Sequence, residues 1–359
     1  MDTVSLCMIV KNEEEVLARC LDSVRGLVEE VIVVDTGSTD RTKEIAARYT
    51  DKVFDFPWAD DFSAARNFSF AQATCGYCMW LDADDVLEPG ARAAFLREKE
   101  SLGPGVDVVM MPYHTGFDES GRPTFVYYRE RIVKNHRGMA WKGPVHEVIE
   151  TRGPIAYWEA AVTHRKLRPS DPGRNLRIFR GLLEKGGSLD PRQQFYYGRE
   201  LYYHQEYGQS LSVLEAVLEG GKGWVENNID ACRHRAYCLY ALGREREALR
   251  ALFQSFCYGL PRAEACCDIG KHFFDRQDWR QAAYWYTLAL GCERQDGRGG
   301  FVSPDAYGYI PYLQLCVCSS RLGDEESARA YNEKAAALKP DSPAVAHNRA
   351  YFAAHLAKA

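Results

Sequence analysis

Apolar residues in the first 90 positions fall into two kinds of pattern. Largely apolar runs, each followed by polar or glycine-containing turn residues, lie at residues 5–10, 31–34 and 78–81, and a short strand-like segment that includes Asp55 lies at 53–56. Between the runs, apolar residues recur every three or four positions, as they do in 16–24. Continuous runs are typical of strands covered on both faces, and the spaced sets are typical of amphipathic helices. The alternation predicts an α/β domain with a parallel sheet and helices on both faces.

Polar residues stand where these predicted strands end. Asn12 and Glu13 follow the first run, Asp35 follows the second, and an acidic cluster follows the fourth. In such sheets ligands bind outside the carboxyl ends of the strands, so we expect these residues to converge on one edge. A carboxylate at a strand end, such as Asp35, can accept hydrogen bonds from ribose hydroxyls or from a base N–H. Its structural alternative is to cap the following turn.

The acidic cluster is Asp82-Ala83-Asp84-Asp85, directly behind the apolar residues 78–81. In extended backbone the side chains of Asp82 and Asp84 point the same way, so their charges repel unless a cation lies between them. Carboxylates of this kind suit Mg²⁺ or Mn²⁺, which proteins commonly bind together with substrate phosphates. The structural alternative is that the acids cap the next helix, whose first turn favours Asp.

Four blocks together resemble glycosyltransferase family 2, whose members are inverting transferases of the GT-A fold. The blocks are residues 5–13, 33–40, 65–67 and 81–85, and they follow the order and spacing of the family. The resemblance is firm over about the first 90 residues and extends more loosely to about residue 170. It implies an α/β GT-A nucleotide-sugar transferase domain, with a Rossmann-like, mostly parallel sheet, over residues 1–170.

The resemblance also implies where the donor binds. The nucleoside of a nucleotide-diphosphate sugar, expected to be a UDP-sugar, would lie against Val10, Asn12, Glu13 and Asp35. Arg66 would lie near the diphosphate or support the acidic loop.

The metal site follows from the same resemblance. Asp82, Ala83 and Asp84 would form the DXD motif, in which Asp82 and Ala83 also contact the donor and the two acids bind Mn²⁺ or Mg²⁺. We expect His164 to close the shell of the metal and the phosphates. Its structural alternative is a hydrogen-bonded imidazole.

Transfer with inversion requires a base that takes the proton of the attacking acceptor group. Residues 106–111 predict a strand and residues 124–133 a pair of strands, and the chemically dense segment 141–147 follows them. A carboxylate near the metal suits the role of base, so Glu147 is the candidate, with His146 as the alternative base or a metal ligand. The structural alternatives are a salt bridge for Glu147 and a hydrogen-bonded imidazole for His146.

Residues 171–359 change to a helical pattern that contains a repeat. The repeated segments are residues 200–218, 235–253, 270–288 and 314–336. Their equivalent turn positions Gly208, Gly243, Asp278 and Gly323 are separated by 35, 35 and 45 residues. A helix–turn–helix unit with a period near 34 residues resembles the tetratricopeptide repeat.

The repeat pattern predicts an all-α, tetratricopeptide-like solenoid over residues 171–359. A hinge is expected at residues 168–173, and the Gly-rich insertion 296–300 accounts for the longest interval. A capping helix is expected over residues 342–357, because the open end of a solenoid must be covered.

Composition excludes several classes of protein. The chain of 359 residues has 45 Lys and Arg against 50 Asp and Glu, a net charge of −5 that gives no basic footprint for nucleic acid. No run approaches the ~18 apolar residues of a membrane span, and the N-terminus lacks the pattern of a signal peptide. The 12 cysteines are scattered, and no second pair accompanies Cys75 and Cys78. We therefore expect reduced thiols in a bacterial cytoplasm rather than a zinc site.

Taken together, the residues and the resemblance predict a metal-dependent inverting hexosyltransferase. A solenoid can hold an extended peptide on its concave face, so the expected acceptor is a side chain of a peptide or protein. One alternative acceptor is a glycan or a lipid-linked sugar of cell-surface polysaccharide synthesis. Another alternative is a non-catalytic repeat scaffold with a degenerate transferase domain, against which the clustered carboxylates argue. The repeats could also mediate a homodimer.

Overall fold

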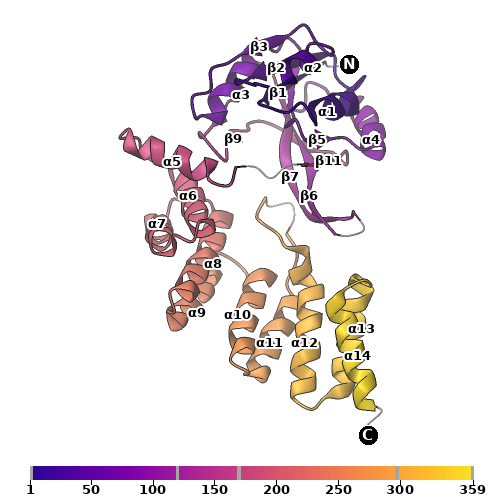
Figure 1. The fold of residues 1–359 in the computed structure, drawn as a ribbon, viewed down its shortest axis with the longest axis vertical. Coiled ribbons are helices and arrows are strands. Elements are labelled where there is room, and N and C mark those ends of the chain that lie inside the picture. Colours follow the sequence, from indigo (N-terminus) through magenta and orange to yellow (C-terminus); the bar gives the residue numbers. More distant parts are fainter. Residues whose placement is uncertain (1–2, 119–120, 168–170, 296–298, 357–359) are drawn as a thin grey trace. The chain divides into compact units, whose positions relative to one another are not determined.

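The computed structural model describes residues 3–118, 121–167, 171–295 and 299–356 (Figure 1). The chain divides into two compact units, 1–196 and 197–359. The division by compactness falls within helix α6 (Pro191–Tyr203), and the domain boundary expected at residue 170 stays a prediction. Residues 168–170 of the expected hinge lie outside the described residues.

The first unit is built on a mostly parallel sheet, as the sequence pattern predicts. Among the described residues, its strands are ordered β3-β2-β1-β4-β7-β6-β11-β5, and β10 pairs with β6. The strands are β1 (Val4–Val10), β2 (Glu30–Asp35), β3 (Val53–Asp55), β4 (Tyr77–Trp80), β5 (Asp85–Val86), β6 (Val108–Phe117), β7 (Pro123–Lys134), β10 (Ile155–Tyr157) and β11 (Val162–His164). β7 runs antiparallel to β4 and β6, and β5 runs antiparallel to β11. A separate hairpin pairs β8 (Trp141–Lys142) with β9 (Val148–Ile149).

Apolar side chains cover the sheet on both faces. The helices of this part are α1 (Leu17–Val24), α2 (Thr42–Ala46), α3 (Phe62–Ala71) and α4 (Pro89–Lys99). Along β1, Leu6 and Met8 belong to one buried cluster, whereas Cys7 between them belongs to another. Because neighbouring side chains of a strand point to opposite faces, the continuous apolar run supplies two cores at once.

β7 is one long strand where the sequence predicted a pair. The chain turns before it instead, where the backbone N–H of Asp118 donates to the carbonyl of Arg122 at 3.0 Å. β6 correspondingly extends to Phe117, beyond the predicted end at residue 111. The β6–β7 ladder has a bulge: Val109 pairs with Ile132 and Met110 with Glu130, so Arg131 is the extra residue. A bulge adds one residue to one strand and locally changes its direction.

The second unit consists of helices that pair as antiparallel hairpins (Figure 1). The pairs are α6 with α7 (Tyr207–Gly220), α8 (Val225–Ala241) with α9 (Glu245–Gln254), α10 (Ala263–Asp275) with α11 (Trp279–Leu290), and α12 (Tyr309–Arg321) with α13 (Glu325–Leu338). Helix α14 (Pro343–Leu356) follows, where the capping helix was expected, and α5 (Arg174–Glu184) precedes α6. Small residues line the seams: a Cβ at Gly270 would lie 3.0 Å from the ring of Tyr286.

Of the four predicted turn positions, Gly208 is wrong, whereas Asp278 lies between α10 and α11, one residue after the left-handed Gln277. Gly208 lies inside α7, and Asp278 caps α11 by accepting from the backbone N–H of Gln281 at 3.2 Å. The left-handed turn residues are Gln205 (φ 63°), Gly243 (φ 73°), Gln277 (φ 60°) and Gly323 (φ 85°). The sequence reading placed the turn at glycine or a capping acid, but a residue with a Cβ can also adopt the left-handed conformation.

Among the described residues, no helix combines the length and the apolar character that crossing a membrane requires. All 12 cysteines are free thiols.

Candidate active site

The ends of β1 and β2 form one side of the site. Val10 pairs with Asp35 across the two strands, and Asp35 is almost completely buried. Oδ1 of Asp35 accepts from the backbone N–H groups of Gly37 (2.9 Å) and Ser38 (2.8 Å). Oδ2 is buried and has no hydrogen-bond partner in the described structure. Asp35 therefore both caps its turn and keeps a second oxygen that a ligand N–H or O–H can satisfy.

The loop after β1 is tied to the loop after β2. The backbone N–H of Asn12 donates to Oγ of Ser38 (2.9 Å), and Oδ1 of Asn12 accepts from the N–H of Thr39 (2.8 Å). The N–H of Glu13 donates to Oγ1 of Thr42 at 2.7 Å. Asn12 adopts φ 57°, a conformation that Asn tolerates better than most residues. These contacts show how Asn12 and Glu13 shape the strand ends.

Arg66 joins the acidic motif to the predicted base. From α3, its Nη2 donates to Oδ1 of Asp82 at 2.7 Å, and its Nε donates to Oε1 of Glu147 at 2.7 Å. The Asp82 side chain is 39% exposed and that of Glu147 is 13% exposed. Burial opposes ionisation of Asp82, but the charges of Arg66 and Arg131 outweigh it and lower the pKa of the carboxyl to about 2. Arg66 thus supports the acidic loop. Glu147 forms a salt bridge with Arg66, which agrees with the structural alternative to its role as a base.

Three guanidinium groups surround the indole of Trp80, the last residue of β4. Their Cζ atoms lie 4.9 Å (Arg66), 4.9 Å (Arg129) and 3.9 Å (Arg131) from the ring centroid. Arginine stacks well on aromatic faces because its charge is delocalised and weakly hydrated. The three guanidinium groups therefore pack against the aromatic ring of Trp80, which lies two residues before the acidic motif.

The residues that could hold a metal ion form a group of two acids and a histidine. Ligand atoms of Asp84, Asp85 and His164 all lie within 4.8 Å of one another. Nδ1 of His164 is 3.3 Å from Oδ1 of Asp84 and 3.4 Å from Oδ1 of Asp85. Burial disfavours the imidazolium, but the hydrogen bonds to the two acids outweigh it and raise the pKa of His164 to about 9. The structure brings together Asp84 and His164 as expected, with Asp85 rather than Asp82 as the third member.

Asp85 is anchored from behind by groups that sequence reasoning missed. It is fully buried, its Oδ2 accepts from Nη1 of Arg131 at 3.0 Å, and its Oδ1 accepts from the hydroxyl of Tyr113 at 2.9 Å. Burial and the charge of Asp85 raise the pKa of Tyr113. The available signal was the sequence Arg129-Glu130-Arg131 inside an otherwise β-prone run, because charged residues within a sheet need buried partners.

His146 lies in a different environment from His164. Its ring stacks on Tyr196 with centroids 4.2 Å apart, and its Nε2 is 3.5 Å from Nδ2 of Asn175. Its backbone φ is 52°. In the described residues, the metal-capable group does not include His146. The role of base or ligand for His146 stays a prediction, and its stacking agrees with the structural alternative.

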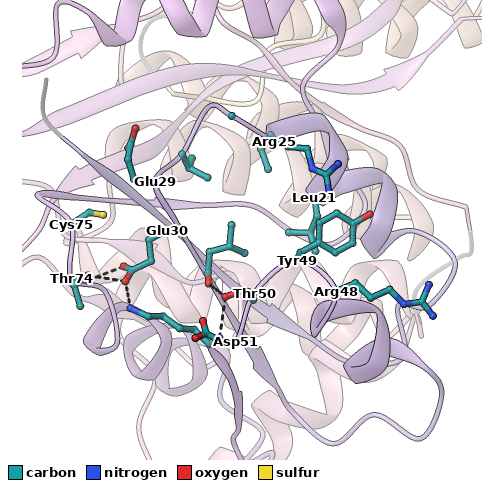
Figure 2. Close-up of a pocket in the computed structure, with 15 residues that line it drawn as sticks. Leu21, Arg25, Glu29, Glu30, Arg48, Tyr49, Thr50, Asp51, Thr74 and Cys75 are labelled. Carbon is teal, nitrogen blue, oxygen red and sulfur yellow. Dashed lines mark hydrogen bonds and ion pairs between the residues drawn. The ribbon is translucent and has the colours of Figure 1, made fainter.

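A pocket of about 490 Å³ opens at the opposite, amino-terminal edge of the sheet (Figure 2). Its acid Glu30 is held by Lys52, by Ser5 and by the hydroxyl of Thr74 at 2.7 Å. Burial opposes ionisation, but these contacts lower the pKa of Glu30 to about 2. The carboxylate of Glu30 therefore already has its partners within the protein. This pocket is not part of the candidate active site.

The model for the family described as glycosyl transferase family 2 matches residues 5–152. Residues 5–152 are therefore similar to glycosyl transferase family 2. The matched residues contain β1 to β9, including Asp35, Arg66, the acidic motif and Glu147. The family 2 domain accordingly has the GT-A-like, mostly parallel sheet that the resemblance implied.

Among curated relatives, a TPR repeat-containing protein of Synechococcus elongatus is 40% identical over 67% of this chain and 60% of its own length. The SPbeta prophage-derived glycosyltransferase SunS of Bacillus subtilis is 26% identical over 61% of this chain and 54% of its own. The lipopolysaccharide core biosynthesis glycosyltransferase LpsC of Rhizobium meliloti is 30% identical over 42% of this chain and 58% of its own length. The chain thus spans about three fifths or less of the length of each of these relatives. Their names and the helical hairpins support a family 2 domain fused to tetratricopeptide-like repeats.

Proposed function

We propose that the chain is a metal-dependent inverting glycosyltransferase that moves a hexose from a nucleotide-diphosphate sugar to a side chain of a peptide or protein. The observation that carries the proposal is that Arg66 links Asp82 to Glu147 at 2.7 Å on each side, within a family 2 domain. One guanidinium thereby fixes the acidic motif next to a carboxylate that has the chemistry of a base.

The donor would bind along the carboxyl ends of β1 and β2. Oδ2 of Asp35 supports this placement, because a buried carboxylate oxygen without a partner is costly until a ligand donates to it. Val10, Asn12 and Glu13 would form the neighbouring wall for the nucleoside. A UDP-sugar remains the expected donor.

The residues present fit a divalent cation. Two carboxylates and an imidazole within 4.8 Å of one another are a donor set that suits Mn²⁺, and Mg²⁺ can use the same carboxylates. Asp84, His164 and Asp85 would hold the ion, with Asp82 on the side of Arg66. When bound, the cation would supply charge stabilisation for the departing nucleoside diphosphate.

The protein's own residues would perform the proton transfer. Glu147 would take the proton of the acceptor hydroxyl while the acceptor oxygen forms its bond to the anomeric carbon. The bond from that carbon to the diphosphate oxygen breaks on the opposite face, so the configuration is inverted. Arg66 would orient Glu147, because its Nε donates directly to the carboxylate. With a thiol acceptor the base would matter less, since a thiol is already partly ionised near neutral pH.

The helical repeats support a macromolecular acceptor, because solenoids offer extended binding surfaces. The resemblance to LpsC favours the second candidate, an acceptor that is a glycan or a lipid-linked sugar. The free thiols of all 12 cysteines support a cytoplasmic location. A homodimer through the repeats remains part of the proposal.

A donor screen tests the proposed activity. Release of nucleoside diphosphate would be measured for a panel of nucleotide sugars, with and without Mn²⁺, for the wild type and for Glu147→Gln. We expect one donor to be turned over only with the cation, and Glu147→Gln to lose most turnover while binding the donor as before. Absence of nucleotide binding and turnover in the folded wild type, with peptide and glycan acceptors present, would instead support the scaffold.

A further inference from the structure

A short irregular segment lies against the first helices of three successive hairpins. Residues 299–303 follow α11 in the chain and contact α6, α8 and the start of α10. The Cζ atom of Arg199 lies 4.2 Å from the centroid of the Phe301 ring. The backbone N–H of Ser303 donates to Oε1 of Glu264 at 2.7 Å. We call the surface formed by Arg199, Glu226 and Glu264 the groove.

Close approach of the segment to the groove requires glycine at two positions. A Cβ on Gly300 would lie 2.6 Å from Oε2 of Glu226, and Gly299 has φ 75° with its Cβ position 3.3 Å from Trp224. The Glu226 carboxylate cannot move away freely, because it is paired with Arg262 at 2.8 Å. The two glycines therefore let the backbone approach Trp224, just before α8, and Glu226 in its first turn.

The segment fills the groove almost completely. The cavity left beside Gly300, Phe301 and Val302 has a volume of about 30 Å³. That is room for about two water molecules at most. The segment thus occupies the place that an extended ligand would take on these helices.

The groove carries the features of a binding surface rather than of an ordinary packing seam. Glu264 is 5% exposed, and its second oxygen accepts from the hydroxyl of Tyr307 at 3.0 Å. Nε of Arg262 is buried and has no hydrogen-bond partner in the described structure. Charged side chains that are buried and held by one another are preorganised, so an occupant that supplies a main-chain N–H gains affinity at low entropic cost.

We propose that this groove is a peptide-binding site and that residues 299–303 are its built-in ligand, which a partner must displace. The partner is an extended peptide that presents glycine followed by an aromatic residue. Glycine fits against Glu226, the aromatic ring stacks under Arg199, and a main-chain N–H two residues later reaches Glu264. The site lies outside the family 2 domain, and its recognition of peptide goes beyond the proposed sugar transfer and is tested without turnover.

Binding of a synthetic peptide in trans tests the inference on the full chain. A fluorescein-labelled peptide with the sequence of residues 299–307 would be titrated into the wild type and into Phe301→Ala and Gly300→Val, which weaken the internal ligand. Affinity for a competing ligand falls with the fraction of molecules whose groove is open. We expect both variants to bind the peptide roughly tenfold or more tightly than the wild type does. A peptide with Ala in place of its Phe should not bind.

Two controls make the result decisive. Tyr284→Ala removes an aromatic side chain that is 63% exposed on α11, so it should bind the peptide like the wild type. Glu264→Gln combined with Phe301→Ala should lose the gain in peptide affinity that Phe301→Ala alone produces.

Hydrogen exchange on the wild type, at saturating peptide, should show faster exchange of the Ser303 amide. Peptide affinity that is equal in the wild type and the folded variants, or absent from all of them, would overturn the inference. Failure of both variants to fold would also overturn it, since the segment would then be part of the core.

Discussion

Arg66 and Glu147 stand 81 positions apart in the chain, yet Nε of Arg66 donates to Oε1 of Glu147 at 2.7 Å. The same guanidinium donates to Asp82, so an arginine of a helix organises two acids from separate loops. Burial disfavours the charge of Arg66, but the two carboxylates outweigh it and raise its pKa. The positive charge is therefore permanent, and the two acids depend on it.

Replacing Arg66 should damage stability and activity together. Arg66→Met leaves Asp82 and Glu147 without their shared cation, and breaking a buried pair on one side costs about 3–5 kcal/mol. We expect urea unfolding to show a loss of this size and turnover to fall by roughly 100-fold or more. Arg41→Met is the matched control, because the Arg41 side chain is 71% exposed in its pair with Glu14. Equal effects of the two substitutions would contradict the structural role of Arg66.

Asp35→Asn should weaken nucleotide binding without loosening the fold. The N–H groups of Gly37 and Ser38 hold Oδ1, so the amide oxygen is expected to take that position and the NH₂ group to replace Oδ2. A ligand N–H or O–H then meets a donor instead of an acceptor, and we expect the Kd of the nucleotide to rise roughly tenfold or more. Calorimetric titration measures the Kd. Asp35→Ala should additionally lower the melting temperature, since it removes the cap of the turn.

Asp84→Asn should remove the response to the divalent cation. Asp84 contributes an oxygen to the metal-capable group and faces His164, so its neutral variant should bind Mn²⁺ roughly tenfold or more weakly. Binding can be followed by the electron paramagnetic resonance signal of free Mn²⁺. Glu88→Gln, which alters an acid that pairs with Arg165 instead, serves as the control. Unchanged Mn²⁺ affinity in Asp84→Asn would refute the assignment of this group.

Protonated His164 should stabilise the metal-free protein at neutral pH, and this stabilisation should disappear at alkaline pH. Its pKa rises from 6.5 to about 9 on folding, so its contribution is complete below pH 6.5 and disappears as the pH passes 9. Relative to His164→Gln, the wild type should lose up to about 3 kcal/mol of unfolding free energy between pH 6 and pH 9.5. Urea unfolding in EDTA measures this difference.

His114 provides a control of opposite sign. Burial and the charge of Arg165 lower the pKa of its imidazole below 6.5. Its protonation therefore opposes folding, and the wild type should lose stability relative to His114→Gln only as the pH falls below 6.5. A stability difference from His114→Gln that changes with pH above pH 7 would contradict the assignment for His114.

The sequence predicted the N-terminal architecture because apolar periodicity and strand-end chemistry are local signals. Asp35, Asp82 and Asp84 could be selected in this way, since each follows a buried run directly. The partners of these acids could not, because contacts between Arg66 and Glu147 or between Asp85 and Arg131 depend on tertiary packing. A charged residue in a strand indicates that a partner exists but does not name it.

The repeats show the same limit on a smaller scale. Their period was visible in the spacing of small and apolar residues, whereas the turns at Gln205 and Gln277 carried no glycine to mark them. The spacing predicts Gly208 as the equivalent of Gly243, but α7 already includes Gly208. The hairpins were therefore recognisable before their turn register was.

The bulge in β7 has a consequence for how the acidic motif is specified. Arg131 occupies no rung of the ladder with β6, so a β7 shorter by one residue would pair without interruption. That regular strand would place no cation against Asp85, and an uncompensated buried carboxylate would remain behind the metal-capable group. The bulge interrupts the regular pairing of β6 with β7 at one residue, and that residue, Arg131, places its positive charge against Asp85. The acidic motif therefore depends on the number of residues in a neighbouring strand as much as on their identity.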